Sequence, residues 1–240
     1  MTAPAVSRRR SIHAAPKAHL HFAADPRYSP RMAKTQKGAE AARLMLILPA
    51  DFADAGFAAA IEEAGVAAVV VPVAENPDER AVLKRVKPLI EAIQAAGAAA
   101  LIQGPADLLG KSGADGLHVA GRDAADAAER FRPGKIVGAG ALRSRDVAME
   151  AGEARVDYVM FGEPGADGGH PPLETVAERA AWWAEVFVVP CVAYAPRIED
   201  IPALSATGAE FVAVGAAIFA APDPRAALLE AAATLVGVEA

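Results

Sequence analysis

Cysteine is almost absent from this sequence, since Cys191 is the only one among 240 residues. One cysteine excludes a disulfide within the chain, which favours a reducing compartment such as the cytoplasm. Long apolar runs are absent too. None reaches about 18 residues without a charge or a proline, so we expect no transmembrane helix and no membrane partner. The net charge of -6 gives no support to nucleic-acid binding by the whole chain.

The residues that are present predict one folded domain behind a basic tail. Hydrophobic residues make up 53% and charged residues 22%, which is enough apolar material for a sizeable core. Residues 1–43 hold nine Lys or Arg against two acidic residues, whereas the remainder is acidic. We therefore expect a flexible basic tail over residues 1–42 and a single domain over 43–240. The role of the tail stays open, as does a start of translation at Met32.

Short apolar segments alternate with Ala-rich helical segments from residue 43 onward. Each apolar segment has four or five residues and almost no polar ones, a pattern typical of parallel strands covered on both faces. Helical segments of about 8–20 residues separate them, as in repeated strand–helix units. The expected strands are Leu44–Leu48, Ala67–Val71, Ala98–Ile102, Gly116–Val119, Ile136–Gly140, Tyr158–Phe161, Pro190–Ala193 and Phe211–Val214.

A glycine recurs where a helix is expected to end before a strand. Glycine readily adopts the left-handed conformation that stops a helix. Eight such units predict an α/β fold, the TIM (β/α)8 barrel. The alternative is a doubly wound open sheet, but its Gly-x-Gly-x-x-Gly turn is missing after the first strand, where Pro49-Ala50-Asp51-Phe52 stands. The recurring glycines are Gly65, Gly97, Gly113, Gly152 and Gly208.

In a TIM barrel the chemistry lies at the carboxyl ends of the strands. There Glu163 and His170, in the loop 162–172, are candidate acids, bases or ligands, and Arg143 is a candidate anion clamp. Asp123 is a candidate metal ligand or the N-cap of the next helix. His118, within a strand, fits a buried, hydrogen-bonded histidine better than a catalytic one. The candidate phosphate-binding residues are Gly215, Ala216, Ala217, Arg122 and Arg197.

Three segments between residues 113 and 224 form a pattern in order and spacing. They are Gly113–Val119 with Asp123, then Asp157–Gly162, then Gly208–Phe219 followed by Asp223-Pro224. Together they resemble the thiamine phosphate synthase family, which includes the thiazole tautomerases. The resemblance covers about residues 98–230 and implies a TIM barrel, in agreement with the periodicity.

This resemblance implies a reaction in thiamine biosynthesis. A pyrimidine methyl diphosphate is joined to a thiazole phosphate while diphosphate leaves with the help of Mg²⁺. Such a reaction needs hard oxygen ligands for magnesium and donors for the phosphates. Asp123 matches the second magnesium aspartate of the family, and Gly215–Ala217 matches its eighth-strand turn.

Other positions depart from the family pattern, and the departures remove side chains that the family uses to bind diphosphate, magnesium and phosphate. A Gln-x-Arg-x-Lys motif at the second strand, the aspartate after the third, a serine at the fifth, a lysine after the sixth and a Gly-Gly pair after the seventh are all replaced. The tautomerase histidine falls near Leu142. The residues that stand at the replaced positions are Val69–Val73, Gln103-Gly104, Gly138–Gly140, His170 and Ala195-Pro196.

Three hypotheses follow for the function. The first is a thiamine phosphate synthase-type transferase with a divergent active site. The second is a barrel that has lost this activity and acts as a phosphate-ligand-binding or regulatory protein. The third is a different lyase or isomerase of a phosphorylated substrate that uses Arg143, Glu163 and His170. The expected partner is a small phosphorylated molecule. A homo-oligomer is also left open, because one residue of Trp182-Trp183 is expected in the core and the other at a subunit contact.

Overall fold

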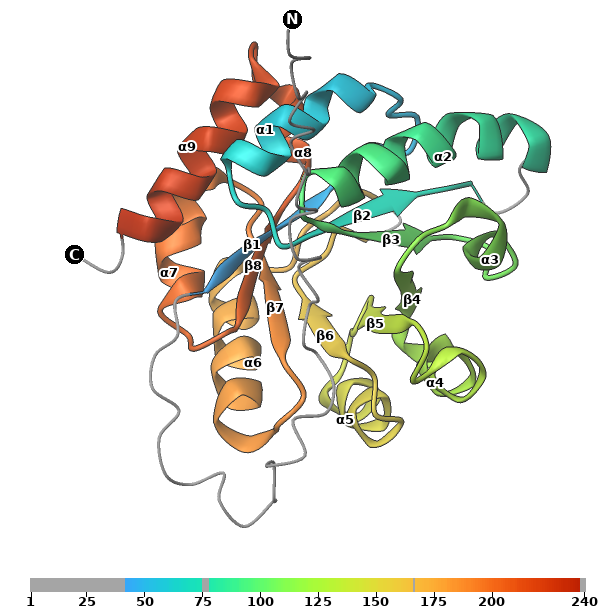
Figure 1. Ribbon diagram of the computed structural model, residues 1–240. Coiled ribbons are helices and arrows are strands. Elements are labelled where there is room, and N and C mark those ends of the chain that lie inside the picture. Colours follow the sequence, from blue (N-terminus) through green and yellow to red (C-terminus); the bar gives the residue numbers. More distant parts are fainter. Residues whose placement is uncertain (1–41, 75–77, 166, 238–240) are drawn as a thin grey trace, which may run out of the picture.

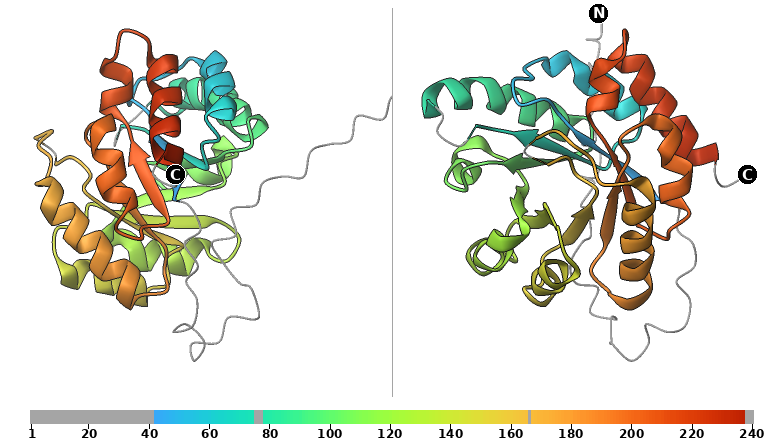
Figure 2. Two further views of the ribbon diagram at one scale, coloured as in Figure 1. Left: turned by 90° about the vertical axis from the view of Figure 1, so that its left-hand side faces the viewer. Right: turned by 180° about the vertical axis from the view of Figure 1, so that it is seen from behind.

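Eight parallel strands close into one barrel with helices around it in the computed structural model (Figures 1 and 2). The structure describes residues 42–74, 78–165 and 167–237, so the predicted tail over 1–42 lies almost wholly outside the described residues. The strands are β1 Arg43–Ile47, β2 Ala68–Pro72, β3 Ala99–Gln103, β4 Gly116–Ala120, β5 Ile136–Gly140, β6 Tyr158–Phe161, β7 Cys191–Tyr194 and β8 Phe211–Val214.

The strand predictions are confirmed, each bound lying within one residue of its expected position. The barrel closes because β1 pairs with β8, from Arg43 opposite Phe211 to Leu46 opposite Val214. This pairing excludes the open-sheet alternative, in which the first and last strands would not meet.

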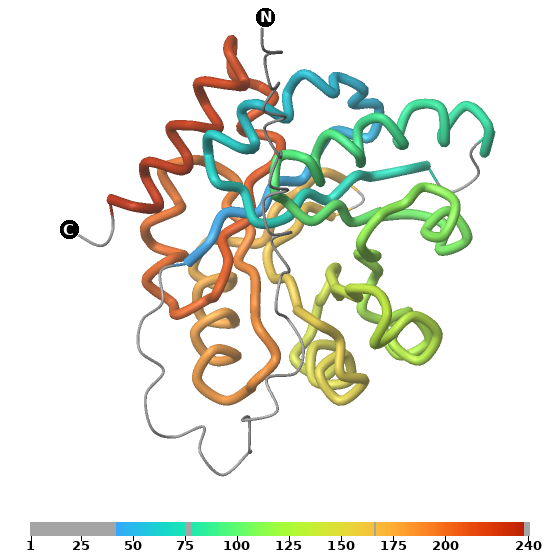
Figure 3. The backbone as a smooth tube through the Cα atoms, in the orientation of Figure 1, coloured from blue at the N-terminus to red at the C-terminus, as the bar shows by residue number. Residues whose placement is uncertain are grey.

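The helices follow the strands, and α8 and α9 both come after β8, where α9 packs beside α1 (Figure 3). Within the described residues, no helix has the length and apolar character needed to cross a membrane. The α-helices are α1 Ala58–Glu63, α2 Glu79–Ala95, α3 Leu108–Ser112, α4 Ala124–Phe131, α5 Arg145–Glu153, α6 Leu173–Val186, α7 Ile201–Ser205, α8 Ala216–Ala220 and α9 Pro224–Val236.

Four of the five recurring glycines are left-handed, as expected at helix ends. Gly65, Gly97, Gly113 and Gly208 have φ values of 62°, 83°, 82° and 82°. The prediction for Gly152 is wrong, because this glycine lies inside α5 and Arg155, with φ 60°, turns the chain instead. A Cβ at Gly152 would lie 2.8 Å from the ring of Trp183, so close packing explains that glycine.

Acidic side chains just before β4, β6 and β8 bind the backbone of the preceding strand. Asp115 accepts a hydrogen bond from Ala100 N at 2.9 Å, and Asp157 accepts one from Val137 N at 2.8 Å. Glu210 accepts one from Cys191 N at 2.9 Å. Each carboxylate satisfies a strand N–H at the start of a strand pair, and it fixes the register of that pair. We call these three contacts the register clamps.

The inside of the barrel is packed unevenly. Large side chains such as Met45 of β1 and Tyr158 and Met160 of β6 belong to one interior cluster and are fully buried. On β4 and β5, His118 lies opposite Gly138, and Ala120 lies opposite Gly140. The missing side chains on β5 leave room inside the barrel for groups from neighbouring strands.

Candidate functional site

A cavity of about 280 Å³ opens at the carboxyl ends of the strands, which is where the barrel fold predicts a site. We call it the mouth cavity. It is bounded by residues at or just after the ends of β1, β3, β6, β7 and β8. The lining residues are Ile47, Leu48, Pro49, Gln103, Glu163, Pro164, Tyr194, Gly215, Ala216 and Phe219.

Below this cavity, a buried hydrogen-bond network crosses the barrel from β6 to β4 and back. The Tyr158 hydroxyl lies 2.8 Å from His118 Nδ1, and Glu163 Oε1 lies 2.8 Å from His118 Nε2. The second carboxylate oxygen of Glu163 accepts a hydrogen bond from Ala141 N at 2.7 Å. The prediction that His118 is buried and hydrogen-bonded is confirmed, and its partner is the candidate residue Glu163.

Glu163 is held in its ionised form. Burial raises the pKa of Glu163, but the charge of His118, hydrogen bonds from His118 and Ala141, and the Arg143 guanidinium lower it, and the net pKa lies below the usual value. Burial raises the pKa of Tyr158 well above the usual value, so this phenol keeps its proton at neutral pH. Because an ionised carboxylate only accepts hydrogen bonds, His118 Nε2 carries a hydrogen and donates it to Glu163.

Two glycines of β5 make this network sterically feasible. A Cβ on Gly140 would lie 2.0 Å from Glu163 Oε2 and 2.3 Å from His118 Nε2. A Cβ on Gly138 would lie 2.0 Å from the Tyr158 ring. The segment Gly138-Ala139-Gly140 stands where the family pattern has a serine at the fifth strand. In this chain its two glycines provide the space for the buried network.

Arg143 and His170 lie outside the buried network. Arg143 contacts the loop that carries Glu163, and His170 contacts a side chain that lines the mouth cavity. Arg143 donates to the backbone oxygens of Glu163 at 3.4 Å and Pro164 at 3.2 Å, and it so fixes the start of the loop that carries Glu163. His170 is exposed and stacks on Tyr194, with ring centroids 5.4 Å apart and planes inclined by 8°. Tyr194 itself lines the mouth cavity.

The turn after β8 forms another wall of the mouth cavity, two strands around the barrel from β6, which Glu163 follows. Gly215 and Ala216 line the cavity, whereas Ala217 is outside its lining. Ala216 N donates to the Tyr194 hydroxyl at 3.4 Å, which is a long hydrogen bond that a better acceptor can replace. Gly215 also lies close to this hydroxyl, because a Cβ there would be 3.1 Å from it.

The other three candidate residues are engaged outside the mouth cavity. The side chains of Arg122 and Asp123 are 83% and 59% exposed and pair with each other at 3.6 Å. Asp123 stands at the N-cap of α4, but its side chain makes no capping hydrogen bond. Arg197 binds the buried carboxylate of Asp200 through two hydrogen bonds of 3.0 and 2.6 Å.

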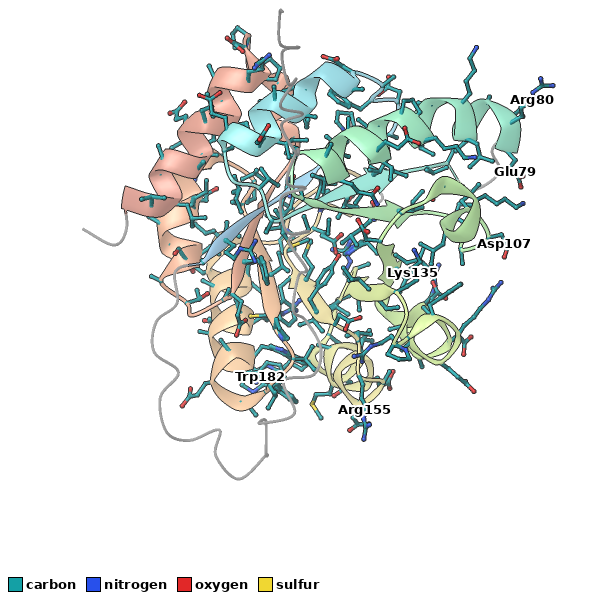
Figure 4. The ribbon with its side chains drawn as sticks, in the orientation of Figure 1. Glu79, Arg80, Asp107, Lys135, Arg155 and Trp182 are labelled. Carbon is teal, nitrogen blue, oxygen red and sulfur yellow. The ribbon has the colours of Figure 1, made fainter. Side chains whose placement is uncertain are left out.

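These positions do not assemble a magnesium site from protein side chains. Asp107, one turn beyond Gln103, is bound by Arg130 at 3.0 Å and lies at the outer edge of the barrel (Figure 4). In the part of the chain that the structure describes, no three His, Cys, Asp or Glu residues are grouped so that they could hold a metal ion. The donor set therefore does not fit a resident magnesium ion.

The two tryptophans occupy different environments. Trp183 is fully buried and donates from Nε1 to Val189 O at 2.7 Å. Trp182, labelled in Figure 4, is half-buried and has the Arg145 guanidinium 4.8 Å from its ring centroid. The expectation that one of the pair lies in the core is confirmed for Trp183. Cys191 is buried in β7, as its position in a strand predicts.

Comparison with known proteins places the chain among the relatives that its sequence pattern resembles. The family model described as "Thiamine monophosphate synthase" matches residues 44–218. The chain is 37% identical over 197 residues to "Thiamine-phosphate synthase" of Rhodospirillum centenum, a match that covers 78% of this chain and 95% of that protein. It is 37% identical over 125 residues to the protein of the same name from Erythrobacter litoralis, covering 48% and 56%.

Solved structures agree on the fold. "Thiamine phosphate pyrophosphorylase" from Pyrococcus furiosus superposes with a TM-score of 0.69 at 22% identity, over 82% of this chain and 97% of that one. A 3-hexulose-6-phosphate synthase superposes with a TM-score of 0.63, also at 22% identity, over 80% and 99%. At these identities the likeness establishes the barrel fold alone.

Proposed function

The chain belongs to the thiamine monophosphate synthase family, and from this membership we propose that its mouth cavity binds phosphorylated ligands of the thiazole and pyrimidine type. The activity that we propose is that of a thiamine phosphate synthase with a divergent active site, acting in the reducing cytoplasm. The family membership supports a place in thiamine biosynthesis. The ligands and the chemical steps are our proposal.

The observation that carries this proposal is the position of the mouth cavity. It is built by five different strand ends on one face of the barrel, where TIM-barrel enzymes place their substrates. Its volume of about 280 Å³ suits one small ring-bearing ligand, near the lower limit of ordinary ligand pockets. Tyr194, Phe219 and Pro164 supply apolar surface for such a ring.

In the proposed reaction the carbon–oxygen bond between the pyrimidine methylene and diphosphate breaks, and its electron pair leaves with diphosphate. The lone pair of the thiazole nitrogen then forms the new carbon–nitrogen bond. We propose that the Ala216 N–H donates to a phosphate oxygen, and that the Glu163 carboxylate stabilises the positive charge that develops on the pyrimidine. A magnesium ion would arrive with the diphosphate, and Asp123 would be its protein contact.

The second candidate function is a barrel that binds a phosphorylated ligand without the synthase reaction, as a regulatory protein or a different lyase or isomerase. It is favoured by the lining of the mouth cavity, because none of the described residues that line it is Lys or Arg. A diphosphate leaving group ordinarily needs cationic donors, and their loss should cost several kcal/mol of transition-state stabilisation. The buried pair of Glu163 and His118 offers such an enzyme a proton acceptor.

A synthesis assay with a blocked cavity tests the first proposal. The purified protein is incubated with the pyrimidine diphosphate, the thiazole phosphate and a titration of Mg²⁺, and thiamine phosphate is measured. We expect product from the wild type, and its loss in Ala216→Leu, in which the larger side chain enters the mouth cavity. The matched control is Ala220→Leu, an exposed position at the other end of α8, which should keep the activity.

The outcomes separate the candidates. No product from folded wild type at any Mg²⁺ concentration rejects the synthase and leaves the binding or alternative-enzyme function. Equal product from Ala216→Leu and Ala220→Leu rejects the mouth cavity as the place of the reaction. Calorimetric binding of the thiazole phosphate without product formation supports the second candidate.

A further inference from the structure

Glu163 gives the mouth cavity its charge. Among the described residues that line this cavity, Glu163 is the one whose side chain ionises at neutral pH. We propose that Glu163 is the specificity-determining residue of the cavity, where its carboxylate binds a cationic or N–H-bearing ring and turns the ligand's phosphate away. This inference rests on the proposed function in one respect, that the mouth cavity is the ligand site.

The carboxylate has acceptor capacity left for a ligand. Each oxygen of Glu163 accepts one hydrogen bond, from His118 Nε2 at 2.8 Å and from Ala141 N at 2.7 Å. An ionised carboxylate has about four acceptor sites, two on each oxygen. Because Glu163 also lines the mouth cavity, the unused sites are available to a hydrogen-bond donor that enters it.

The position of the charge is fixed. His118 contacts Glu163 on one side and the Tyr158 hydroxyl on the other, and the side chains of all three residues are buried. The space that Gly140 leaves is filled by the carboxylate, so the side chain has little freedom to rotate away. A carboxylate that is already held in position loses little conformational entropy when a ligand binds, and it discriminates between ligands by charge.

The other walls suit a flat ring. Tyr194 carries the stacked ring of His170, and it faces the same cavity as Phe219. Phe219 is held by two further rings, Phe52 and Phe57, with centroids 5.2 and 5.6 Å away. Aromatic side chains that are held in this way offer rigid apolar surface, against which an aromatic ligand can pack.

Charge and hydrogen bonding together orient the ligand. A phosphate beside Glu163 would meet a like charge in a partly desolvated site, and the described lining residues include no Lys or Arg that could bind it directly. The turn at Gly215 and Ala216 instead offers a backbone N–H, now held by a hydrogen bond of 3.4 Å to Tyr194. The structure therefore favours a ligand with a positive or N–H-bearing ring at Glu163 and its anionic group at the β8 end.

Two small rings of opposite charge test this inference. The probes are 4-aminopyridine, which is a cation at neutral pH, and isonicotinate, a ring of the same size with an anionic substituent. Binding of each probe is measured by calorimetry at low salt to the wild type, Glu163→Gln and Glu178→Gln. The last variant makes the same substitution at an exposed position of α6.

We expect the wild type to bind the cation at least about tenfold more tightly than the anion, because a charge-assisted hydrogen bond is worth more than 1 kcal/mol. Glu163→Gln should lose this preference, whereas Glu178→Gln should keep it. Equal binding of both probes by the wild type, or a preference that survives in folded Glu163→Gln, overturns the inference. If Glu163→Gln does not fold, the wild-type comparison still decides.

The probes undergo no alkyl transfer, so this test is independent of the synthesis assay. If the wild type prefers the cation but makes no thiamine phosphate, the charge-selecting role of Glu163 is supported and the synthase activity is rejected. A wild type that makes thiamine phosphate but binds both probes equally retains the synthase and rejects the role.

Discussion

Replacing Gly140 with alanine should separate the buried pair of Glu163 and His118. The added Cβ would lie 2.0 Å from Glu163 Oε2 and 2.3 Å from His118 Nε2, distances that no relaxed structure tolerates. The backbone of Gly140 is outside the left-handed region, so the effect arises from the collision and not from backbone strain. Either β5 must move or the hydrogen bond between Glu163 and His118 must break.

The free-energy cost of each outcome can be estimated. Forcing an extra methyl group into a packed interior costs about 1–3 kcal/mol. Leaving a buried polar group without its hydrogen-bond partner costs about 1–3 kcal/mol, and more when the group is charged. Because the Glu163 carboxylate has an opening to the mouth cavity and can partly re-solvate, we expect Gly140→Ala to lower the free energy of unfolding by about 2–4 kcal/mol.

Urea unfolding followed by circular dichroism measures this loss. The matched control is Gly110→Ala, in the exposed interior of α3, where a Cβ meets no atom within 4 Å and should stabilise the protein by about 0.5–1 kcal/mol. In a Glu163→Ala background, the cost of Gly140→Ala should fall by at least about 1 kcal/mol. A Gly140→Ala protein within about 0.5 kcal/mol of the wild type would refute the reasoning.

The remaining predictions concern three carboxylates and the groups that contact them. The folded-state pKa of Glu163 is lowered from its ordinary value of about 4.5, so its ionised form stabilises the fold above that pH. This stability is lost as the pH falls through the lower folded-state pKa. In thermal unfolding from pH 7 to 3, Glu163→Gln should therefore lose less stability at acid pH than the wild type does. Asp157→Ala should cost about 1–3 kcal/mol in urea, because Val137 N loses its acceptor, whereas Asp157→Asn should cost less. Lys111→Ala, which removes the exposed bridge to Glu79, should change stability by less than about 1 kcal/mol.

The barrel could be predicted from the sequence because its signals are local. Eight apolar segments and the left-handed glycines each depend on a few neighbouring residues, and strand bounds followed to within one residue. The exception is instructive. Gly152 has the same sequence context as the other glycines, but its role is to admit the ring of Trp183, which lies 31 residues further along the chain, and no local pattern reports that contact.

The candidate site could be predicted only in part. The sequence predicts Glu163 and the β8 turn at the mouth of the barrel, because the carboxyl ends of the strands converge there. The pairing of Glu163 with His118, 45 residues apart, depends on which face each strand turns inward and on the space left by Gly140. Asp123 illustrates the limit of family patterns, since its position matches a metal ligand while its side chain is exposed and pairs with Arg122.

The register clamps divide the barrel into modules. The carboxylates of Asp115, Asp157 and Glu210 each join an even-numbered strand to the odd-numbered strand before it. The residue at the same position, directly before β2, is Ala67, which has no carboxylate. A chain cut between β4 and β5 would leave every clamp inside one of the two fragments, whereas a cut between β5 and β6 would separate Asp157 from Val137. We therefore expect the first pair of fragments to reassemble when they are mixed and the second to reassemble poorly. The alternation of acidic residues thus marks where this barrel can be divided and rebuilt.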